Sequence, residues 1–126
     1  MKETDGGFDL DEIAGLFTRE GKFLLARWGR PVAPVMFGLA DESLSIFRDV
    51  VRAVYAHAGH PLAETDPDMG ANLITFFVRD WAELEEVPDL DRLTGQQDLP
   101  ARLSARVADQ YRLFRFDAGG AIRACI

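Results

Sequence analysis

The sequence predicts an α+β fold: a small mixed sheet of about four strands, with a β-α-β crossover, a C-terminal β-hairpin and helices packed on the sheet. Apolar residues recur at helical spacing over 43–58, which predicts a long amphipathic helix. Apolar runs on either side of it, at 32–37 and 71–78, predict the two strands that this helix connects. The segments 111–117 and 121–126, separated by an Ala-Gly-Gly turn, predict the hairpin.

Length and composition are those of one globular domain. With 126 residues the chain can form a hydrophobic core without disulfides or metals, so we expect a single domain over 1–126 whose residues 1–8 are a flexible tail. The net charge of −7 argues against nucleic acid and against anionic membrane surfaces as partners. The start lacks the apolar core of a signal peptide, which predicts a cytoplasmic protein. The alternative, a folding unit cut from a longer secreted protein, stays open.

The first predicted helix begins near Asp9. Asp9 and Glu12 form a D-x-x-E start, a variant of the capping box. Gly21 is the residue at which we expect this helix to end. The apolar residues that follow the cap share one helical face: Leu10, Ile13, Leu16 and Phe17.

The central helix is the strongest periodic signal in the chain. We expect Asp41 or Ser43 to cap its start, and Gly59 followed by Pro61 to mark its end. Each large apolar side chain on its inner face would stabilise the fold by roughly 1.5–3 kcal/mol if buried. These apolar positions are Leu44, Phe47, Val50, Val51, Val54, Tyr55 and Ala58.

Further short helices are predicted between the second strand and the hairpin. A second D-x-x-E start at Asp80 opens a helix with Trp81, Leu84 and Val87 on one face. A single helical turn is expected at 89–94. Another helix is expected from Asp98 to about Gln110, with Leu103 and Val107 facing inward.

Two histidines near the end of the central helix are candidates for metal binding. Helical zinc motifs such as H-E-x-x-H place two histidines on one face with a glutamate between them as base. The sequence His57-Ala-Gly-His60 has neither this spacing nor the base, and His60 lies beyond the expected helix end. We therefore expect a helix-terminal histidine and a loop histidine, with no bound zinc.

Glu64, Asp66 and Asp68 follow the histidines and occupy every second position, as the first ligands of a calcium loop do. A twelve-residue EF-hand loop needs glycine at its sixth position and glutamate at its twelfth. Counted from Glu64 through Asp66 and Asp68, those positions hold Met69 and Thr75. A solvated polar loop is the prediction here, and no cofactor is expected.

Nucleophilic catalysis has no support in the sequence. There is no G-x-S-x-G elbow and no phosphate-cradling glycine loop. Cys125, the single cysteine, falls in the last predicted strand and is interpreted as structural. An alternative stays open, in which the chain is a small enzyme or ligand-binding domain. Its participants would be His57, His60, Glu64 and Asp66, together with Arg79.

Acidic residues gather on and after the helix that starts at Asp80. If Trp81, Leu84 and Val87 face inward, the acids flank or oppose that stripe and are open to a basic protein partner. Pairing with Arg102 and Arg106 of the same chain is the competing interpretation. The predicted partner-binding residues are Glu83, Glu85, Glu86, Asp89 and Asp91.

Two stretches carry a family resemblance. In LARWGRPVAPVMFG, at 25–38, an R-W-x-x-P-V pattern leads into a strand, and ANLITFFVRD, at 71–80, is a strand that follows a long helix. These stretches resemble a bacterial family, the domain of unknown function 2927 family, over residues 10–85. The family is similar to zincin-type metallopeptidases, so the resemblance implies the strand–helix–strand front half of a zincin-like fold.

The chain also departs from that family. A peptidase-like member would carry an H-E-x-x-H helix after these elements, but both histidines of this chain precede the second strand. The resemblance therefore implies a short or truncated member without the catalytic segment, and it transfers no catalytic or metal-binding residue. The leading prediction is a non-catalytic α+β domain that acts through protein–protein contacts.

Overall fold

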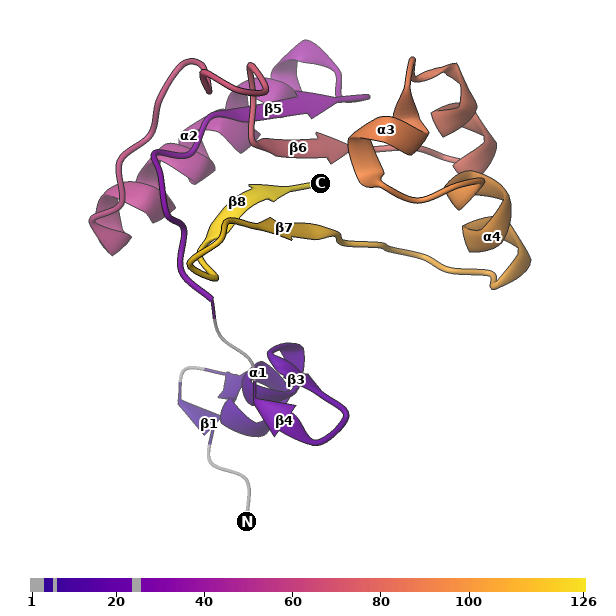
Figure 1. Cartoon of the computed structure of the whole chain (residues 1–126). Helices are drawn as coiled ribbons and strands as arrows, with labels where there is room; N and C mark the ends of the chain where they lie inside the picture. The colour runs from indigo at the N-terminus through magenta and orange to yellow at the C-terminus, as the bar shows by residue number, and fades with distance from the viewer. Residues whose placement is uncertain (1–3, 6, 24–25) are drawn as a thin grey trace.

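The computed structural model describes residues 4–5, 7–23 and 26–126, and it confirms the α+β fold. A four-stranded mixed sheet forms the centre of the molecule, in the order β5-β6-β8-β7 (Figure 1). All four strands coincide with predicted ones. Their bounds are β5 (Pro34–Phe37), β6 (Leu73–Phe76), β7 (Phe114–Phe116) and β8 (Ile122–Cys125).

Strand pairing follows from the connections. The crossover through the long helix makes β5 and β6 parallel, with Val35 opposite Ile74. β8 pairs with β6 in parallel, Leu73 being opposite Cys125, and β7 runs antiparallel to β8 as a hairpin. β5 therefore lies at one edge of the sheet, a position that tolerates Pro34, because an edge strand has no neighbour on one side.

Helix α2 (Asp41–Ala58) connects β5 to β6, but its cap differs from the prediction. Its N-cap is Ala40, without a side-chain bond to the first turn, so neither Asp41 nor Ser43 caps it. The predicted end is correct. Gly59 is left-handed, its N–H donates to Ala56 O, and the His60 N–H donates to Tyr55 O, which is a Schellman motif.

The apolar face of α2 is less buried than the sequence predicts. No residue of α2 is buried; Leu44, Val51 and Tyr55 on its inner side are half-buried, and Phe47 makes an edge-to-face contact with Phe77. The strands of the sheet that α2 covers are short, so the sheet contacts only one side of the helix. Four of the seven predicted inner positions are exposed: Phe47, Val50, Val54 and Ala58. Ile46, which was not among them, is exposed as well.

The buried core lies around β5, β6 and β8 and continues beneath the helices that follow β6. Val32 and Asn72 are the largest fully buried side chains. Apolar residues from both regions complete the core: Ala33, Met36, Ile74, Leu84, Leu90, Leu99, Leu103, Ile122 and Ala124.

Three short helices occupy the end of the sheet where β6 finishes (Figure 1). They are the 3₁₀-helix η1 (Trp81–Glu86), α3 (Leu90–Thr94) and α4 (Leu99–Ala105). The turn predicted at 89–94 is confirmed. Trp81 Nε1 donates to Ala108 O at 2.7 Å, which ties the start of η1 to the end of α4.

Two details of this region correct the sequence analysis. The helix predicted at Asp80 is 3₁₀ rather than α, and the Asp80 side chain makes no cap bond to it. α4 ends at Ala105 instead of near Gln110, since Val107 adopts a left-handed conformation with φ of 52°. Val107 is consequently 88% exposed, whereas Leu103 is buried as predicted.

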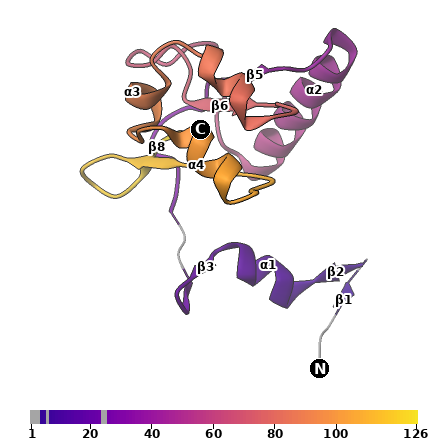
Figure 2. The same cartoon turned by 90° about the vertical axis from the view of Figure 1, so that its right-hand side faces the viewer.

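Residues 4–5 and 7–23 belong to a small N-terminal arm that lies apart from the sheet in two perpendicular views (Figures 1 and 2). Asp9 caps α1 by accepting from the Asp11 and Glu12 N–H groups, as predicted. The helix ends at Leu16 rather than at Gly21, which instead lies in the turn between β3 and β4. The elements of the arm are β1 (Thr4–Asp5), β2 (Phe8–Asp9), α1 (Leu10–Leu16), β3 (Thr18–Arg19) and β4 (Lys22–Phe23).

The expected flexible tail at 1–8 falls partly on the first strand pair, in which Thr4 is opposite Asp9 and Asp5 is opposite Phe8. The rest of that expectation, at residues 1–3 and 6, lies outside the described residues. Within the described part of the chain, no helix is both long enough and apolar enough to cross a bilayer.

Candidate functional site

The histidine and acid candidates lie on the segment between α2 and β6. His57 is exposed in the last turn of α2, and Glu64 is exposed on the loop. The half-buried His60 places its Nε2 2.9 Å from Arg30 O, a contact that fixes the loop to the segment before β5. His60 therefore has a structural partner, and His57 and Glu64 remain on the surface.

Asp66 is the one member of this group that is buried, with 5% of its surface exposed. Its Oδ2 accepts from the N–H groups of Asp68 and Met69 at 3.0 and 2.9 Å, which closes an Asx turn. Its Oδ1 accepts from Asn72 Nδ2 at 3.0 Å and from Arg30 Nη1 at 3.2 Å. The carboxylate is thus saturated by bonds from its own chain.

Asn72 completes this network, and the sequence analysis did not single it out. Its Oδ1 accepts from the Ala33 N–H at 2.7 Å, and its Nδ2 donates to Pro31 O at 2.9 Å as well as to Asp66. Asn72 is fully buried just before β6. The bonds to Ala33 and Pro31 hold the start of β6 against the start of β5, so Asn72 joins the two parallel strands at their amino ends, and the third bond attaches the loop at Asp66.

Electrostatics favour the charged state of this network. Burial alone would raise the pKa of the Asp66 carboxyl, but hydrogen bonds from Met69, Asn72, Arg30 and Asp68 outweigh it and lower the pKa. Hydrogen bonds to Asp68 and to Asp66 raise the pKa of the Arg30 guanidinium. Arg30 also reaches Asp68 Oδ2 at 2.8 Å, so one arginine links two turns of the loop.

These contacts hold the loop against the segments that precede β5 and β6. In the described ranges, no three His, Cys, Asp or Glu side chains are grouped so that they could hold a metal ion. Arg79 follows β6, whereas Asp66 and Asn72 precede it, so the strand separates Arg79 from the other candidates. The structure does not bring His57, His60, Glu64, Asp66 and Arg79 together as one polar site.

The predicted acidic residues lie on η1, on α3 and between them. Glu83, Glu85 and Glu86 are exposed on η1 while Leu84 is buried, as the stripe of apolar residues predicts. Asp89 and Asp91 are exposed at the start of α3. The separation of an inner apolar side from an outer acidic side is therefore correct.

A hollow of about 470 Å³ opens between η1, α3 and α4. Its apolar lining comes from Leu84, Val87, Leu90, Pro100 and Ala101. Its charged lining comes from Glu85, Asp89, Asp91, Asp98 and Arg92. We call this concavity the acidic hollow. We call its five apolar lining residues the apolar floor; four carboxylates and one guanidinium complete the lining.

The hollow includes Asp98, which the sequence analysis did not assign to the partner surface. Asp98 precedes α4 in a left-handed conformation, as Asp89 does before α3, so both carboxylates border the same concavity. Glu83 and Glu86 do not line it. The predicted run of five acids is therefore divided by the structure into three lining residues and two flanking ones.

Among the described residues, no arginine forms an ion pair with these acids, although Arg92 lines the same hollow. Ion pairs in the described part of the chain join Arg30 to Asp66 and Asp68, and Arg52 to Asp49; none involves an acid of the hollow. Arg102 donates to Gln96 Oε1 at 3.0 Å instead. The structure therefore gives no support to internal pairing with Arg102 or Arg106.

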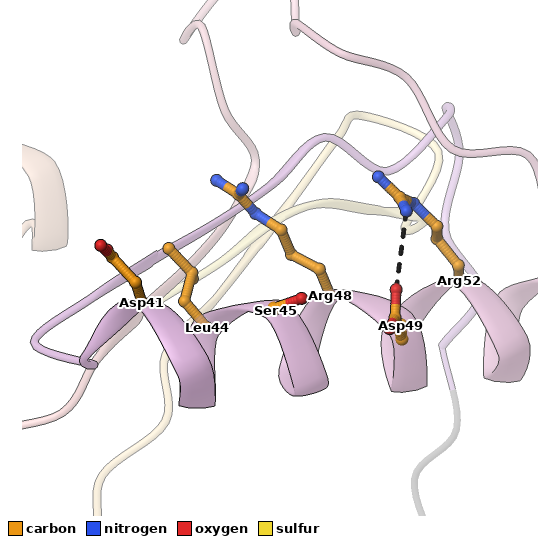
Figure 3. Close-up of a pocket in the computed structure, with 6 residues that line it drawn as sticks. All are labelled: Asp41, Leu44, Ser45, Arg48, Asp49 and Arg52. Carbon is orange, nitrogen blue, oxygen red and sulfur yellow. Dashed lines mark ion pairs between the residues drawn. The ribbon is translucent and has the colours of Figure 1, made fainter.

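A second hollow, of about 300 Å³, lies along one face of α2 (Figure 3). Arg48 and Arg52 extend in the same direction from the helix, and Arg52 Nη1 lies 3.7 Å from Asp49 Oδ1 (Figure 3). Asp41, Leu44 and Ser45 complete the lining. All six lining residues belong to one helix and carry mixed charges, so this feature is a groove in a solvated helix face.

Cys125 is half-buried in β8. Burial raises the pKa of its thiol, and the nearby positive charge of Arg112 only partly offsets this effect. A thiol with a raised pKa is a poor nucleophile at neutral pH, which agrees with the structural role expected for this residue.

The comparisons with known proteins found no match: no family model, no curated protein and no solved structure is similar to this chain.

Proposed function

We propose that this protein is a non-catalytic binding domain whose acidic hollow docks a basic protein segment. One observation carries the proposal: four carboxylates and five apolar residues line the same concavity, and none of the carboxylates is paired with an arginine of the chain within the described residues. Repulsion among close carboxylates on a helix costs only a few tenths of a kcal/mol per pair in water. A cationic partner would relieve that repulsion and would also cover the apolar floor.

The chemistry of the hollow defines the partner. Leu84, Leu90 and Pro100 are buried at the hollow, whereas Val87 is half-buried and Ala101 is exposed. The accessible apolar surface is therefore small, and the docked segment needs one apolar side chain to cover it. Glu85, Asp89, Asp91 and Asp98 line the same hollow, so Lys or Arg should flank the apolar residue. The acids are exposed to solvent and screened by salt, and we expect weak affinity with strong salt dependence.

We also propose that the chain is related to the domain of unknown function 2927 family. The layout of β5, α2 and β6 supports it, because this is the strand–helix–strand order of the front half of a zincin-like fold. The domain then functions without the catalytic segment of that fold. The enzyme alternative built on His57, His60, Glu64 and Asp66 has less support, since Asp66 and His60 are engaged in bonds to other parts of the chain.

Charge reversal inside the hollow tests the proposal. The test variant is Glu85→Lys with Asp91→Lys, and the matched control is Glu42→Lys with Glu64→Lys, which makes the same charge change at exposed positions outside the lining. The probes are two fluorescent peptides, one alternating Leu with Lys and Arg, the other alternating Leu with Glu.

We expect the unmodified protein to bind only the basic peptide, and to lose most of that binding between about 50 and 300 mM NaCl. The lining variant should bind at least ten-fold more weakly, whereas the control variant should bind within two-fold of the unmodified protein. Both variants should unfold at nearly the same temperature as the unmodified protein. Equal loss of binding in the two variants would overturn the site, and absence of binding to the unmodified protein would overturn the function.

A further inference from the structure

Helix α3 forms one side of the acidic hollow. It supplies Leu90, Asp91 and Arg92 to the lining, and Asp89 lines the hollow directly before it. Two of the four carboxylates of the hollow therefore depend on where α3 lies. The helix has only five residues, and so short a helix is not stable in water by itself. Its position has to come from contacts with the rest of the chain.

The other two helices of the hollow are packed more firmly than α3. η1 and α4 lie against each other, and Trp81 Nε1 donates to Ala108 O to tie them together. α3 is not packed in this way on any other described element. Its buried side chains are Leu90 and Thr94, and Thr94 Oγ1 donates to Leu90 O at 2.9 Å. That bond lies within α3, so it stabilises the helix without fixing where the helix sits.

One hydrogen bond crosses from the sheet to α3. Arg115, half-buried in β7, donates from Nη2 to Arg92 O at 3.2 Å. Arg92 O lies in the last turn of α3, where the carbonyl groups of a helix lack partners within the helix. Among the residues that the structure describes, this bond is the one that joins α3 to another helix or strand.

The end of α3 leaves space for this guanidinium. Gly95 follows the helix in a left-handed conformation with φ of 70°, and a Cβ there would lie 3.1 Å from Arg115 Nη2. A side chain at this position would therefore crowd the arginine. Because the donor is charged, its bond to the carbonyl is also stronger than a bond between neutral groups.

We infer that Arg115 is a positioning residue for the acidic hollow. From β7 it fixes the end of α3, and it thereby holds Asp89 and Asp91 where a basic segment meets them. Arg115 does not line the hollow, so it acts through α3 and not on the docked segment. The effect on binding rests on the proposed function, whereas the hold on α3 does not.

The sign of the effect separates positioning from plain electrostatics. Neutralising Arg115 makes the surroundings of the hollow more negative, which by itself would strengthen the binding of a basic peptide. Loss of positioning weakens that binding instead. Arg112→Gln is the matched control, because Arg112 precedes β7 in the same segment and is exposed. It makes no hydrogen bond or ion pair among the described residues.

Peptide binding and amide exchange are measured for the unmodified protein, Arg115→Gln and Arg112→Gln. The probe is the fluorescent peptide that alternates Leu with Lys and Arg. Arg115→Gln should bind it about five-fold more weakly, the effect of one lost hydrogen bond, and Arg112→Gln should bind it as tightly as the unmodified protein or more tightly. Leu93 and Gly95 have N–H groups that donate to carbonyls one turn earlier. Their exchange should be roughly ten-fold faster in Arg115→Gln and unchanged in Arg112→Gln.

A second variant disturbs the same contact without altering β7. Gly95→Ala crowds the guanidinium, so it should also weaken peptide binding. In the Arg115→Gln background the same substitution should cost clearly less, because the guanidinium is no longer there and the strain of a left-handed alanine is common to both backgrounds. Fully additive losses would show that Arg115 and Gly95 do not meet in solution, and the contact would be wrong.

Slow exchange at Ile74, in β6, checks that the sheet stays folded in every variant. If Leu93 and Gly95 stay as protected in Arg115→Gln as in the unmodified protein, the hold on α3 is wrong. If α3 loosens but Arg115→Gln binds the peptide as tightly as Arg112→Gln, Arg115 does not position the hollow. If the unmodified protein binds no basic peptide, the proposed function is wrong and the binding role falls with it, while the exchange rates still decide the hold on α3.

Discussion

Asn72 Nδ2 donates to Asp66 Oδ1 at 3.0 Å, and both side chains are buried. This bond connects the loop that follows α2 to the first residues of β6. Through Asn72 Oδ1 and the Ala33 N–H, it also reaches the start of β5. A buried polar network stabilises a fold when all of its members are satisfied, and removal of one member leaves its partners unpaired. The pair thus explains why a polar loop can be held against a sheet that has little apolar area.

Asp66→Asn tests this network. The substitution keeps the shape of the side chain but removes the charge that receives four donors, so we expect a loss of about 2–3 kcal/mol in the free energy of unfolding at pH 7. The pKa of Asp66 is lowered in the folded state, so its contribution is present above the unfolded pKa of about 4 and is lost as pH falls through the folded value. The difference between the two proteins should therefore shrink below pH 4. Urea denaturation at pH 7, 5 and 3 measures it.

Asp68→Asn is the control for this effect. Asp68 also contacts Arg30, but its side chain is half exposed and its carboxylate receives one donor of those described. We expect a loss below about 1 kcal/mol. A difference between unmodified protein and Asp66→Asn that stayed constant from pH 7 to pH 3 would contradict the role assigned to the charge.

The sequence predicted the sheet well because each strand has a local signal. Apolar runs bounded by glycine or aspartate mark β5, β6 and β8, and the Gly119-Gly120 turn marks the hairpin. Asn72 was not predicted as a structural residue, since its partners Pro31, Ala33 and Asp66 are distant in sequence or irregular in conformation. Periodicity carries no information about such bonds.

Helix α2 shows a different limit. Its apolar positions cover so wide an arc that periodicity alone cannot say which part faces the sheet and which part faces solvent. The acidic hollow could be predicted only in part. Glu85, Asp89 and Asp91 were identified as a charge run, but Asp98 lies beside them only because of the turn between α3 and α4. The concavity itself depends on how three short helices pack, which the sequence does not encode locally.

Gly38→Ala should damage the β5–α2 connection. Gly38 has φ of 92°, and a Cβ there would overlap the carbonyl oxygen of Phe77 on the neighbouring strand end. Backbone strain and displacement of that carbonyl together should cost about 3 kcal/mol in the free energy of unfolding. Gly59→Ala is the matched comparison. Gly59 is also left-handed, but nothing lies within 4 Å of the added Cβ, so about 1 kcal/mol is expected. Thermal unfolding compares the two variants. Equal losses of stability would show that the contact with Phe77 contributes nothing.

Val107→Gly should stabilise the protein, which is uncommon for removal of an apolar side chain. The Val107 N–H donates to Ser104 O and the Ala108 N–H donates to Leu103 O, so α4 ends in the same Schellman motif as α2, with valine where α2 has Gly59. A β-branched residue in the left-handed region is strained by roughly 1–2 kcal/mol, and the 88% exposed side chain loses little packing when it is removed.

The net gain expected for Val107→Gly is about 1 kcal/mol, a rise of a few degrees in the unfolding temperature. Ala105→Gly, two residues earlier and inside α4, provides the control because it adds the same freedom to the unfolded chain without relieving strain, and it should destabilise by about 1 kcal/mol. Differential scanning calorimetry of the two variants separates the effects. If both glycines lowered the unfolding temperature alike, Val107 would not be strained in solution, and the early end of α4 would need another cause.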